Sequence, residues 1–326
     1  MLPNQPVNKS PKWRARARSR TADRGRCQGL SVIELMIALT LGILVLAGMS
    51  QVYLANKKSL SVIDNMGRIQ EVGRFGMQFL TRDLRRAGYC GGNADTETIL
   101  GTLGTAPTVN ECAAGSATYG RMVDAPVIGT NDVDTAYGCV SNYLGGDILV
   151  ARYAAPTPVT TLEAARLYLR TSLFGGRIFA GANSAANLLV GETPQWTFPM
   201  VANGYYVSDT GEACGPKALP ALSRVSLDSN GVPANEELIP GVEQLQVQYG
   251  QDTNNDGSID QIVNADVVGD WTQTILVRVW LLARSECPEV GHDDNKTYVM
   301  GDLVYTPGDN YRRQMYQVTV SLRNSG

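Results

Sequence analysis

The longest apolar run of the chain lies near its N-terminus. From Leu30 to Asn56 the only charged residue is Glu34, and the next charge is Lys57. A helix that rises about 1.5 Å per residue over this run is long enough to cross a hydrocarbon core of roughly 30 Å. The pattern therefore predicts a membrane-spanning helix over residues 30–56 that carries a single carboxylate near its start.

The apolar pattern continues downstream at helical spacing, which predicts an amphipathic extension of the same helix over residues 57–87. Gly88 is well placed to end it. We interpret three glycines in the extension, Gly67, Gly73 and Gly76, as points of close helix packing. The predicted stripe consists of Val62, Met66, Ile69, Val72, Phe75, Phe79 and Leu84.

From Gly88 onward the chain changes to short alternating runs separated by turn residues. Residues 242–250 alternate apolar and glutamine positions, which predicts a half-buried strand, and 274–284 are apolar on both faces, as in a central strand. The remaining predictions are strands at 147–153, 222–228, 261–268 and 317–324, and a short helix at 161–170. The sequence therefore predicts an α+β fold, in which a long N-terminal helix packs on a mainly antiparallel sheet of a β-rich domain, residues 88–326.

The net charge of −3 conceals an uneven distribution. Residues 1–29 carry eight basic residues and one acid, which leaves 20 basic and 30 acidic residues downstream. A basic segment before an apolar span predicts that the N-terminus stays in the cytoplasm and that the body after Lys57 crosses the membrane. Nucleic-acid binding is disfavoured, because the basic segment has no interleaved aromatic residue beyond Trp13.

The chain contains six cysteines, one of which, Cys27, lies in the basic segment. No CxxC pair occurs, so a zinc site is not expected. In an exported domain scattered cysteines are disulfide candidates. Order alone suggests Cys90–Cys112 and Cys214–Cys287 but does not fix the connectivity. The candidates are Cys90, Cys112, Cys139, Cys214 and Cys287.

The segment GLSVIELMIAL, which begins at Gly29, resembles the class III signal of type IV prepilins and pseudopilins. Three later segments, 68–92, 242–260 and 311–324, resemble minor pilins of the PilW family, whereas residues 95–240 resemble nothing specific. The resemblance implies a pilin-like fold and cleavage between Gly29 and Leu30, which removes a leader of residues 1–29. It also implies methylation of the new amino terminus at Leu30.

Cleavage would create a charged amine at Leu30. The carboxylate of Glu34 in one subunit could then neutralise the amine of a neighbour, which offsets the cost of burying either charge alone. Glu34 is therefore interpreted as an assembly residue. The resemblance implies a minor pilin that primes or supports type IV pilus assembly in a tip complex, and hence serves pilus biogenesis, twitching motility and adhesion.

The resemblance also implies partners and a location. The expected partners are other minor pilins, the major pilin, the prepilin peptidase, the inner-membrane assembly platform and a PilY-type tip adhesin. The protein would first span the inner membrane once, with a periplasmic body, and later enter the pilus. Two alternatives stay open: a J-type pseudopilin of a type II secretion system, and a calcium-dependent adhesin that uses the pilin export route.

The stretch DTNNDGSID resembles the first part of an EF-hand loop, with Gly257 at the sixth position. Val263 replaces the glutamate expected at position 12, so the loop is not a complete EF-hand. A hairpin turn at Asp256-Gly257 explains the same residues without metal. No cofactor is required, and calcium and the plain turn both stay open. The candidate ligands are Asp252, Asn254, Asp256, Ser258 and Asp260.

Catalytic motifs are absent from the sequence. The only histidine, His292, lies beside Asp293 and Asp294, but no nucleophile motif accompanies it. Phosphate-binding loops, dinucleotide fingerprints, GxSxG and HExxH do not occur. The chain is therefore expected to be non-enzymatic.

Overall fold

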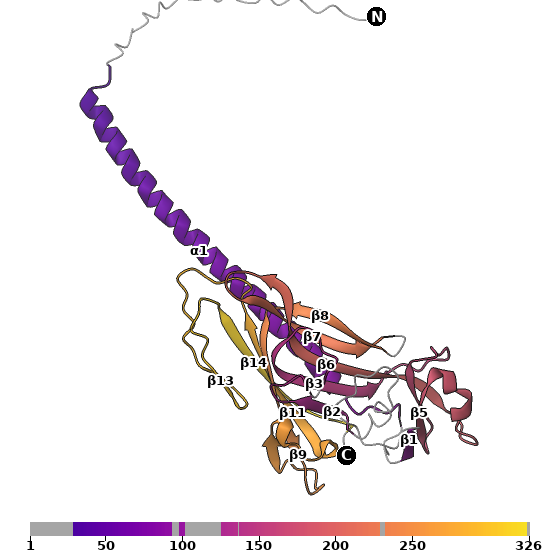
Figure 1. The fold of residues 1–326 in the computed structure, drawn as a ribbon. Helices are drawn as coiled ribbons and strands as arrows, with labels where there is room; N and C mark the ends of the chain where they lie inside the picture. Colours follow the sequence, from indigo (N-terminus) through magenta and orange to yellow (C-terminus); the bar gives the residue numbers. More distant parts are fainter. Residues whose placement is uncertain (1–28, 93–97, 102–124, 136, 229–231, 325–326) are drawn as a thin grey trace, which may run out of the picture. The chain divides into compact units, whose positions relative to one another are not determined.

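The computed structural model describes residues 29–92, 98–101, 125–135, 137–228 and 232–324 (Figure 1). The chain divides into two compact units at Lys58/Ser59. The predicted leader, Cys27 and Cys112 lie outside the described residues, and so does the suggested Cys90–Cys112 pairing.

Helix α1 extends over 53 residues, Val32–Leu84, and confirms the predicted long helix. Within the described chain it is the one helix long and apolar enough to cross a membrane. Gly88 follows with φ +78, a left-handed conformation that glycine adopts without strain after a helix. Its amide donates to the carbonyl of Arg152 at 2.9 Å, which connects the end of the helix to the β domain.

In the second unit, the buried face of α1 agrees only in part with the apolar stripe predicted from the sequence. A Cβ on Gly73 would lie 2.0 Å from the ring of Tyr316, and one on Gly76 would lie 2.7 Å from Leu281. The packing interpretation is therefore confirmed at Gly73 and Gly76. It is wrong at Gly67, which has nothing within 4 Å, and Phe75 is exposed rather than packed. The buried residues of α1 are Ile69, Gly73, Gly76, Leu80, Asp83 and Leu84.

Two sheets and a small hairpin form the β domain. The larger sheet has the order β1-β5-β4-β6-β3-β2, and β7 pairs with β6 and β8. Its pairs are antiparallel except β1 with β5. Its strands are β1 Ile99–Gly101, β2 Val127–Thr130, β3 Tyr143–Ala154, β4 Leu167–Thr171, β5 Gly176–Ala180, β6 Trp196–Ala213, β7 Ala218–Leu227 and β8 Pro233–Pro240.

The smaller sheet has the antiparallel order β10-β9-β11-β14. β11 lies inside this sheet between β9 and β14, as its two apolar faces predicted. The strands are β9 Val242–Gln251, β10 Gln261–Val263, β11 Thr274–Arg284 and β14 Arg313–Ser321, and the separate hairpin is β12 Tyr298–Met300 with β13 Leu303–Tyr305. Short 3-10 helices occupy Gly181–Asn183 (η3), Ala185–Asn187 (η4), Ala265–Val267 (η5) and Trp271–Gln273 (η6).

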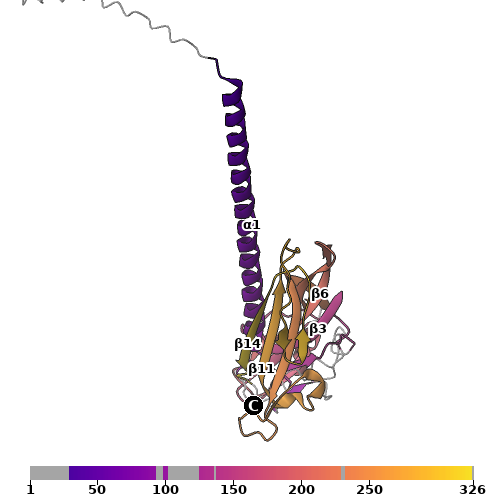
Figure 2. The same ribbon diagram turned by 90° about the vertical axis from the view of Figure 1, so that its left-hand side faces the viewer.

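The main core joins the second half of α1 to both sheets. Leu80 and Leu84 of α1, Tyr205 of β6 and Leu281 of β11 belong to one buried cluster. Figure 2 shows this part of α1 alongside β14 and β11. The arrangement confirms the α+β prediction of a helix packed on antiparallel strands.

Two secondary-structure predictions are wrong. The expected helix at 161–170 is absent, because Leu167–Thr171 forms β4, which pairs with β5 and β6. All five residues of β4 are buried, so sheet pairing overrides the local helix preference of this stretch. The strand expected at 261–268 ends at Val263 and gives way to η5. The strand expected at 147–153 lies within β3. The strand expected at 222–228 lies in β7, except that β7 ends at Leu227. The strand expected at 317–324 begins within β14, which ends at Ser321.

Candidate functional site

Glu34 lies in the first turn of α1 and helps to form the start of the helix. The amide of Ser31 donates to Oε2 of Glu34 at 3.2 Å, and the amide of Ile33 donates to Oγ of Ser31 at 3.3 Å. Such reciprocal bonds form a capping box, which satisfies amides that a helix start leaves unpaired. The Ser-x-x-Glu spacing is visible in the sequence, although Glu34 was interpreted from it only as a residue that acts between subunits.

Gly29 and Leu30 precede the first residue of α1. The side chain of Leu30 is 77% exposed. The two residues flanking the expected cleavage site therefore lie outside regular helix. Cleavage and methylation at this position stay predictions.

The loop 252–260 connects β9 to β10, and Gln251 pairs with Gln261 across it. The hairpin interpretation is therefore confirmed. Asn255 and Gly257 within this loop have positive φ angles of 58 and 83, the left-handed conformation that asparagine and glycine adopt most readily.

Backbone amides of the same loop bind the carboxylates of the predicted calcium ligands. Asp252 accepts from the amides of Asp256 (3.1 Å) and Gly257 (2.7 Å). Asp260 accepts from the amide and the hydroxyl of Thr253. These bonds to Thr253 lower the pKa of Asp260. Calcium binding at this loop stays a prediction, because the turn is held together without it.

The described part of the chain contains no metal centre built from acidic, histidine and cysteine side chains alone. Among the described residues, no three aspartate, glutamate, histidine or cysteine side chains group so as to hold a metal ion. His292 is half-buried in its loop, and its carbonyl accepts a hydrogen bond from Asn310 Nδ2 at 2.5 Å. Among the described residues, Nε2 of its ring has no hydrogen-bond partner.

The structure contains the disulfide Cys214–Cys287, whose sequence separation is 73 residues. It confirms one of the two suggested pairings. Cys139 is also disulfide-bonded, and the buried Cys90 lies with its sulfur 3.0 Å from the carbonyl oxygen of Gly88.

A buried ion-pair network lies near the Cys214–Cys287 disulfide. Arg313, whose side chain is fully buried, contacts Glu243, Asp294 and Asp309. Lys217 also pairs with Asp309, at 2.6 Å. Desolvation raises the pKa of Asp309, but the bonds from Arg313 and Lys217 outweigh it and hold this pKa below its usual value of 3.8.

The network contacts the disulfide through an aromatic residue. The guanidinium of Arg284, which pairs with Glu243, lies 4.2 Å from the ring centroid of Tyr311. The hydroxyl of Tyr311 donates to the carbonyl of Cys214 at 2.6 Å. Sequence analysis missed this network, because its members are distant in sequence and no spacing signals their contact.

Asp83 is a second residue that sequence reasoning missed. It is fully buried, and its Oδ2 accepts from Asn203 Nδ2 (2.5 Å) and Tyr205 Oη (2.6 Å), both on β6. Burial and the charge of Asp83 raise the pKa of Tyr205 well above its usual value. The helical spacing that passes through Gly76 and Leu80 also reaches Asp83, which is the signal that could have found it.

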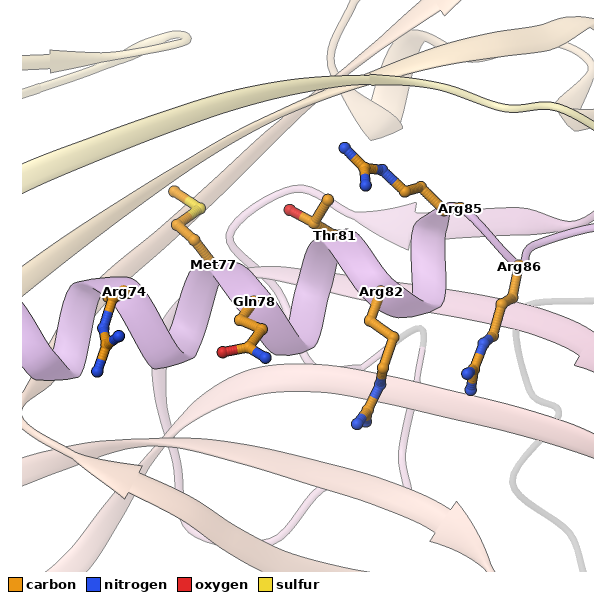
Figure 3. Close-up of a pocket in the computed structure, with 7 residues that line it drawn as sticks. All are labelled: Arg74, Met77, Gln78, Thr81, Arg82, Arg85 and Arg86. Carbon is orange, nitrogen blue, oxygen red and sulfur yellow. The ribbon is translucent and has the colours of Figure 1, made fainter.

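The exposed face of the same helix segment is basic. A shallow hollow of about 500 Å³ is lined by Arg74, Met77, Gln78, Thr81, Arg82, Arg85 and Arg86. Figure 3 shows Arg74, Gln78, Arg82 and Arg86 on one side of α1, and Met77, Thr81 and Arg85 on the other. Among the described residues only Arg82 of these arginines pairs with a carboxylate, Asp83 at 3.4 Å. Such guanidinium groups can bind carboxylates of a partner.

One comparison with known proteins matches the C-terminal elements of the β domain. Residues 204–324, which include the disulfide, the ion-pair network and the hairpin loop, match the family model described as Type IV Pilus-assembly protein W. Among solved structures the chain is similar to the type IV-like pilin TTHA1219 from Thermus thermophilus. The identity is 15%, the coverage is 79% of this chain and 98% of that chain, and the TM-score is 0.37. No curated protein matches the chain.

The family match covers consecutive elements of the β domain, from within β6 to the end of β14. The same chain carries one long apolar helix before that domain, as expected of a pilin. Over residues 204–324, the chain is therefore similar to the family described as Type IV Pilus-assembly protein W.

Proposed function

We propose that this protein is a minor pilin that primes type IV pilus assembly as part of a tip complex. The family match over residues 204–324 carries the proposal. Residues 30–56 would anchor the protein in the inner membrane, with the basic N-terminus in the cytoplasm and the β domain outside. Its partners would be other minor pilins, the major pilin, the assembly platform and a PilY-type adhesin.

Glu34 would act in two steps. Before assembly it accepts the amide of Ser31 and stabilises the start of α1. Cleavage after Gly29 converts Leu30 into a free amine, and Glu34 of one subunit then pairs with the amine of its neighbour. The pair is favourable in an apolar fibre core, because either charge buried alone would cost several kcal/mol. Pairing of the Glu34 carboxylate with the neighbouring amine also sets the axial register of the two helices.

Two substitutions at Glu34 distinguish its role in helix capping from its role in charge pairing. Glutamine keeps an oxygen that can accept the Ser31 amide but has no charge, whereas alanine loses both. We expect Glu34→Gln and Glu34→Ala to abolish piliation and twitching alike, while both variants accumulate in the membrane. Gly29→Ala is the matched processing variant and should give uncleaved protein.

Several outcomes would contradict the proposal. If Glu34→Gln assembles pili normally, helix capping is the only role of Glu34 and the charge pair is wrong. If pili form with uncleaved Gly29→Ala protein, the assembly mechanism fails. If deletion of the protein stops protein secretion and leaves the pili intact, the chain is a J-type pseudopilin.

A further inference from the structure

The basic hollow on α1 carries more positive charge than the described part of the chain compensates. Its four arginines, Arg74, Arg82, Arg85 and Arg86, fall within 13 residues and are all exposed. Among the described residues, their one ion pair joins Arg82 to Asp83 at 3.4 Å. A single carboxylate therefore faces four guanidinium groups, which leaves a surplus of positive charge around the hollow.

The helix dipole accounts for only part of this charge. Basic side chains stabilise the last turn of a helix, because the carbonyl groups at that end carry partial negative charge. Arg82, Arg85 and Arg86 lie in or just after the last turn of α1, which ends at Leu84. Arg74 lies well before that turn, where the dipole no longer favours a base. Another cause is needed for a basic residue at position 74.

Two of the arginines lie over aromatic rings of the same helix. Phe75 is 42% exposed, and the guanidinium carbon of Arg74 lies 4.7 Å from the centroid of its ring. The guanidinium carbon of Arg82 lies 5.2 Å from the ring centroid of Phe79. These cation–π contacts restrain both guanidinium groups, so less side-chain freedom is lost when a partner binds. Arginine and aromatic side chains are also enriched in protein–protein interfaces relative to ordinary surface.

A lipid surface is a poor partner for the hollow. Arg74 follows Asn56, the last residue of the predicted span, and the intervening 18 residues correspond to roughly 27 Å of helix. Attraction between exposed charges decays over about 8 Å at physiological ionic strength. Headgroups at the end of the span would therefore lie beyond the reach of these arginines.

The β domain has the opposite charge. Residues 88–326 contain 13 basic and 26 acidic residues, whereas residues 57–87 contain seven basic and three acidic ones. A subunit of this type therefore offers carboxylates that complement the guanidinium groups of another subunit. Contact between a basic helix and an acidic β domain is heterologous, because two different surfaces meet, and heterologous contacts can build open helical filaments.

We propose that the arginines around the hollow form an interface that binds the acidic β domain of a neighbouring pilin subunit in the fibre. This inference rests on the proposed function, in which α1 leaves the membrane and enters the fibre. Arginine suits the role, because its planar group can bind a carboxylate through two parallel hydrogen bonds. The contact would orient the neighbouring β domain, whereas the Glu34 pair sets the axial register of the helices.

Charge reversal at the hollow tests the interface in cells that assemble pili. Arg74→Glu and Arg85→Glu are combined, because neither side chain pairs with a carboxylate among the described residues. We expect this double variant to lower surface piliation by about tenfold, because like charges would then meet at the interface. Arg74→Lys with Arg85→Lys keeps the charge and should retain most of the piliation.

Lys296→Glu is the matched control. It reverses an exposed charge outside the hollow and should leave piliation unchanged. All of these variants replace exposed side chains, so the purified proteins in detergent micelles should keep the Tm of the wild type.

Photo-crosslinking identifies the partner while the arginines stay intact. A photoreactive amino acid replaces Gln78, which is exposed and lies between Arg74 and Arg82 on the helix (Figure 3), and the cells are then irradiated. We expect crosslinks to peptides of a pilin β domain that contain aspartate or glutamate. The same crosslinks should be lost when Arg74→Glu and Arg85→Glu are added.

The possible results separate the interface from the proposed function. The interface is overturned if the reversed variant assembles pili as the wild type does, or if Lys296→Glu lowers piliation equally. It is also overturned if position 78 crosslinks only to lipid or within its own chain. If Glu34→Gln abolishes piliation while the reversed variant retains it, the proposed function stands and only the interface is wrong. Intact pili after deletion of the protein would overturn both.

Discussion

Gly73 lies where α1 comes closest to β14. A Cβ at this position would lie 2.0 Å from the ring of Tyr316, whose hydroxyl donates to the carbonyl of Ile69. The ring cannot move away without breaking that bond or opening the core around it. A single hydrogen in place of a methyl group therefore sets the distance between helix and sheet.

Replacement of Gly73 tests this contact. We expect Gly73→Ala to lower the free energy of unfolding by about 1–3 kcal/mol, as overpacking does in a dense core. Gly67→Ala is the control, because nothing lies within 4 Å of the added methyl. At position 67, alanine should stabilise the helix by up to about 1 kcal/mol, because alanine has a higher helix propensity than glycine. Equal effects in chemical denaturation would show that Gly73 has no special packing role.

Asp83 forms buried hydrogen bonds where α1 packs against β6. It is the acceptor for both Asn203 and Tyr205, so its removal leaves two buried donors unpaired. We expect Asp83→Ala to destabilise the protein by at least about 1–3 kcal/mol, the cost of one unsatisfied buried group. The double variant with Tyr205→Phe should lose less than the sum of the single changes. Additive losses in denaturant unfolding would contradict a direct Asp83–Tyr205 interaction.

At the scale of elements, the β9–β10 hairpin depends on the backbone conformation of its turn. Gly257 has φ +83 and an open surrounding, so a side chain there meets strain but no clash. We expect Gly257→Ala to destabilise the domain by about 1 kcal/mol and Gly257→Asn by less, because asparagine tolerates the left-handed conformation. Thermal unfolding of the two variants checks the order, and a reversed order would contradict the turn geometry.

The disulfide Cys214–Cys287 connects the end of β6 to the segment after β11. Reduction releases a long loop, because the two cysteines are separated by 73 residues. We expect removal of the bond in a Cys214→Ser, Cys287→Ser variant to cost about 2–5 kcal/mol. Denaturant unfolding measures the loss, and an unchanged midpoint would show that the ion-pair network and Tyr311 hold these segments without the bond.

At the scale of the whole molecule, the network around Arg313 couples stability to pH. Arg313 and Lys217 depress the pKa of Asp309 below 3.8. A carboxylate with a depressed pKa stabilises the folded state fully above its unfolded pKa, and the contribution is lost as the pH falls through the folded pKa. We therefore expect the free energy of unfolding to fall as the pH drops below about 4.

Asp309→Asn isolates this contribution. The variant should be less stable than the wild type at neutral pH, and the difference should shrink in acid, where Asp309 becomes protonated in both states. Asp293→Asn is the control, because Asp293 is an exposed carboxylate outside the Arg313 pairs. A difference between wild type and Asp309→Asn that stays constant with pH would contradict the coupling.

Features that depend on local residue pattern could be predicted from the amino-acid sequence. The apolar run from Leu30, the continuation of α1 and the alternation of β9 follow from residue spacing and were predicted correctly, whereas α1 ends at Leu84, before the predicted end at residue 87. The Asp256-Gly257 turn belongs to the same class, because its conformation is decided by neighbouring residues. The long helix and the antiparallel strands together fixed the α+β class before any contact was known.

Contacts between distant segments depend on the folded chain and could not be predicted from residue spacing. The strand at Leu167–Thr171 replaces a locally favoured helix because β5 and β6 supply its partners. Asp83 and Arg313 bind residues that no short spacing connects to them, and Asn131, which follows β2, donates a hydrogen bond to Asp302 in the β12–β13 turn. The spacing of apolar residues predicts which face of a helix or strand is apolar. Whether a residue on that face is buried, and whether its charge is paired, depends on which other segments of the chain pack against it.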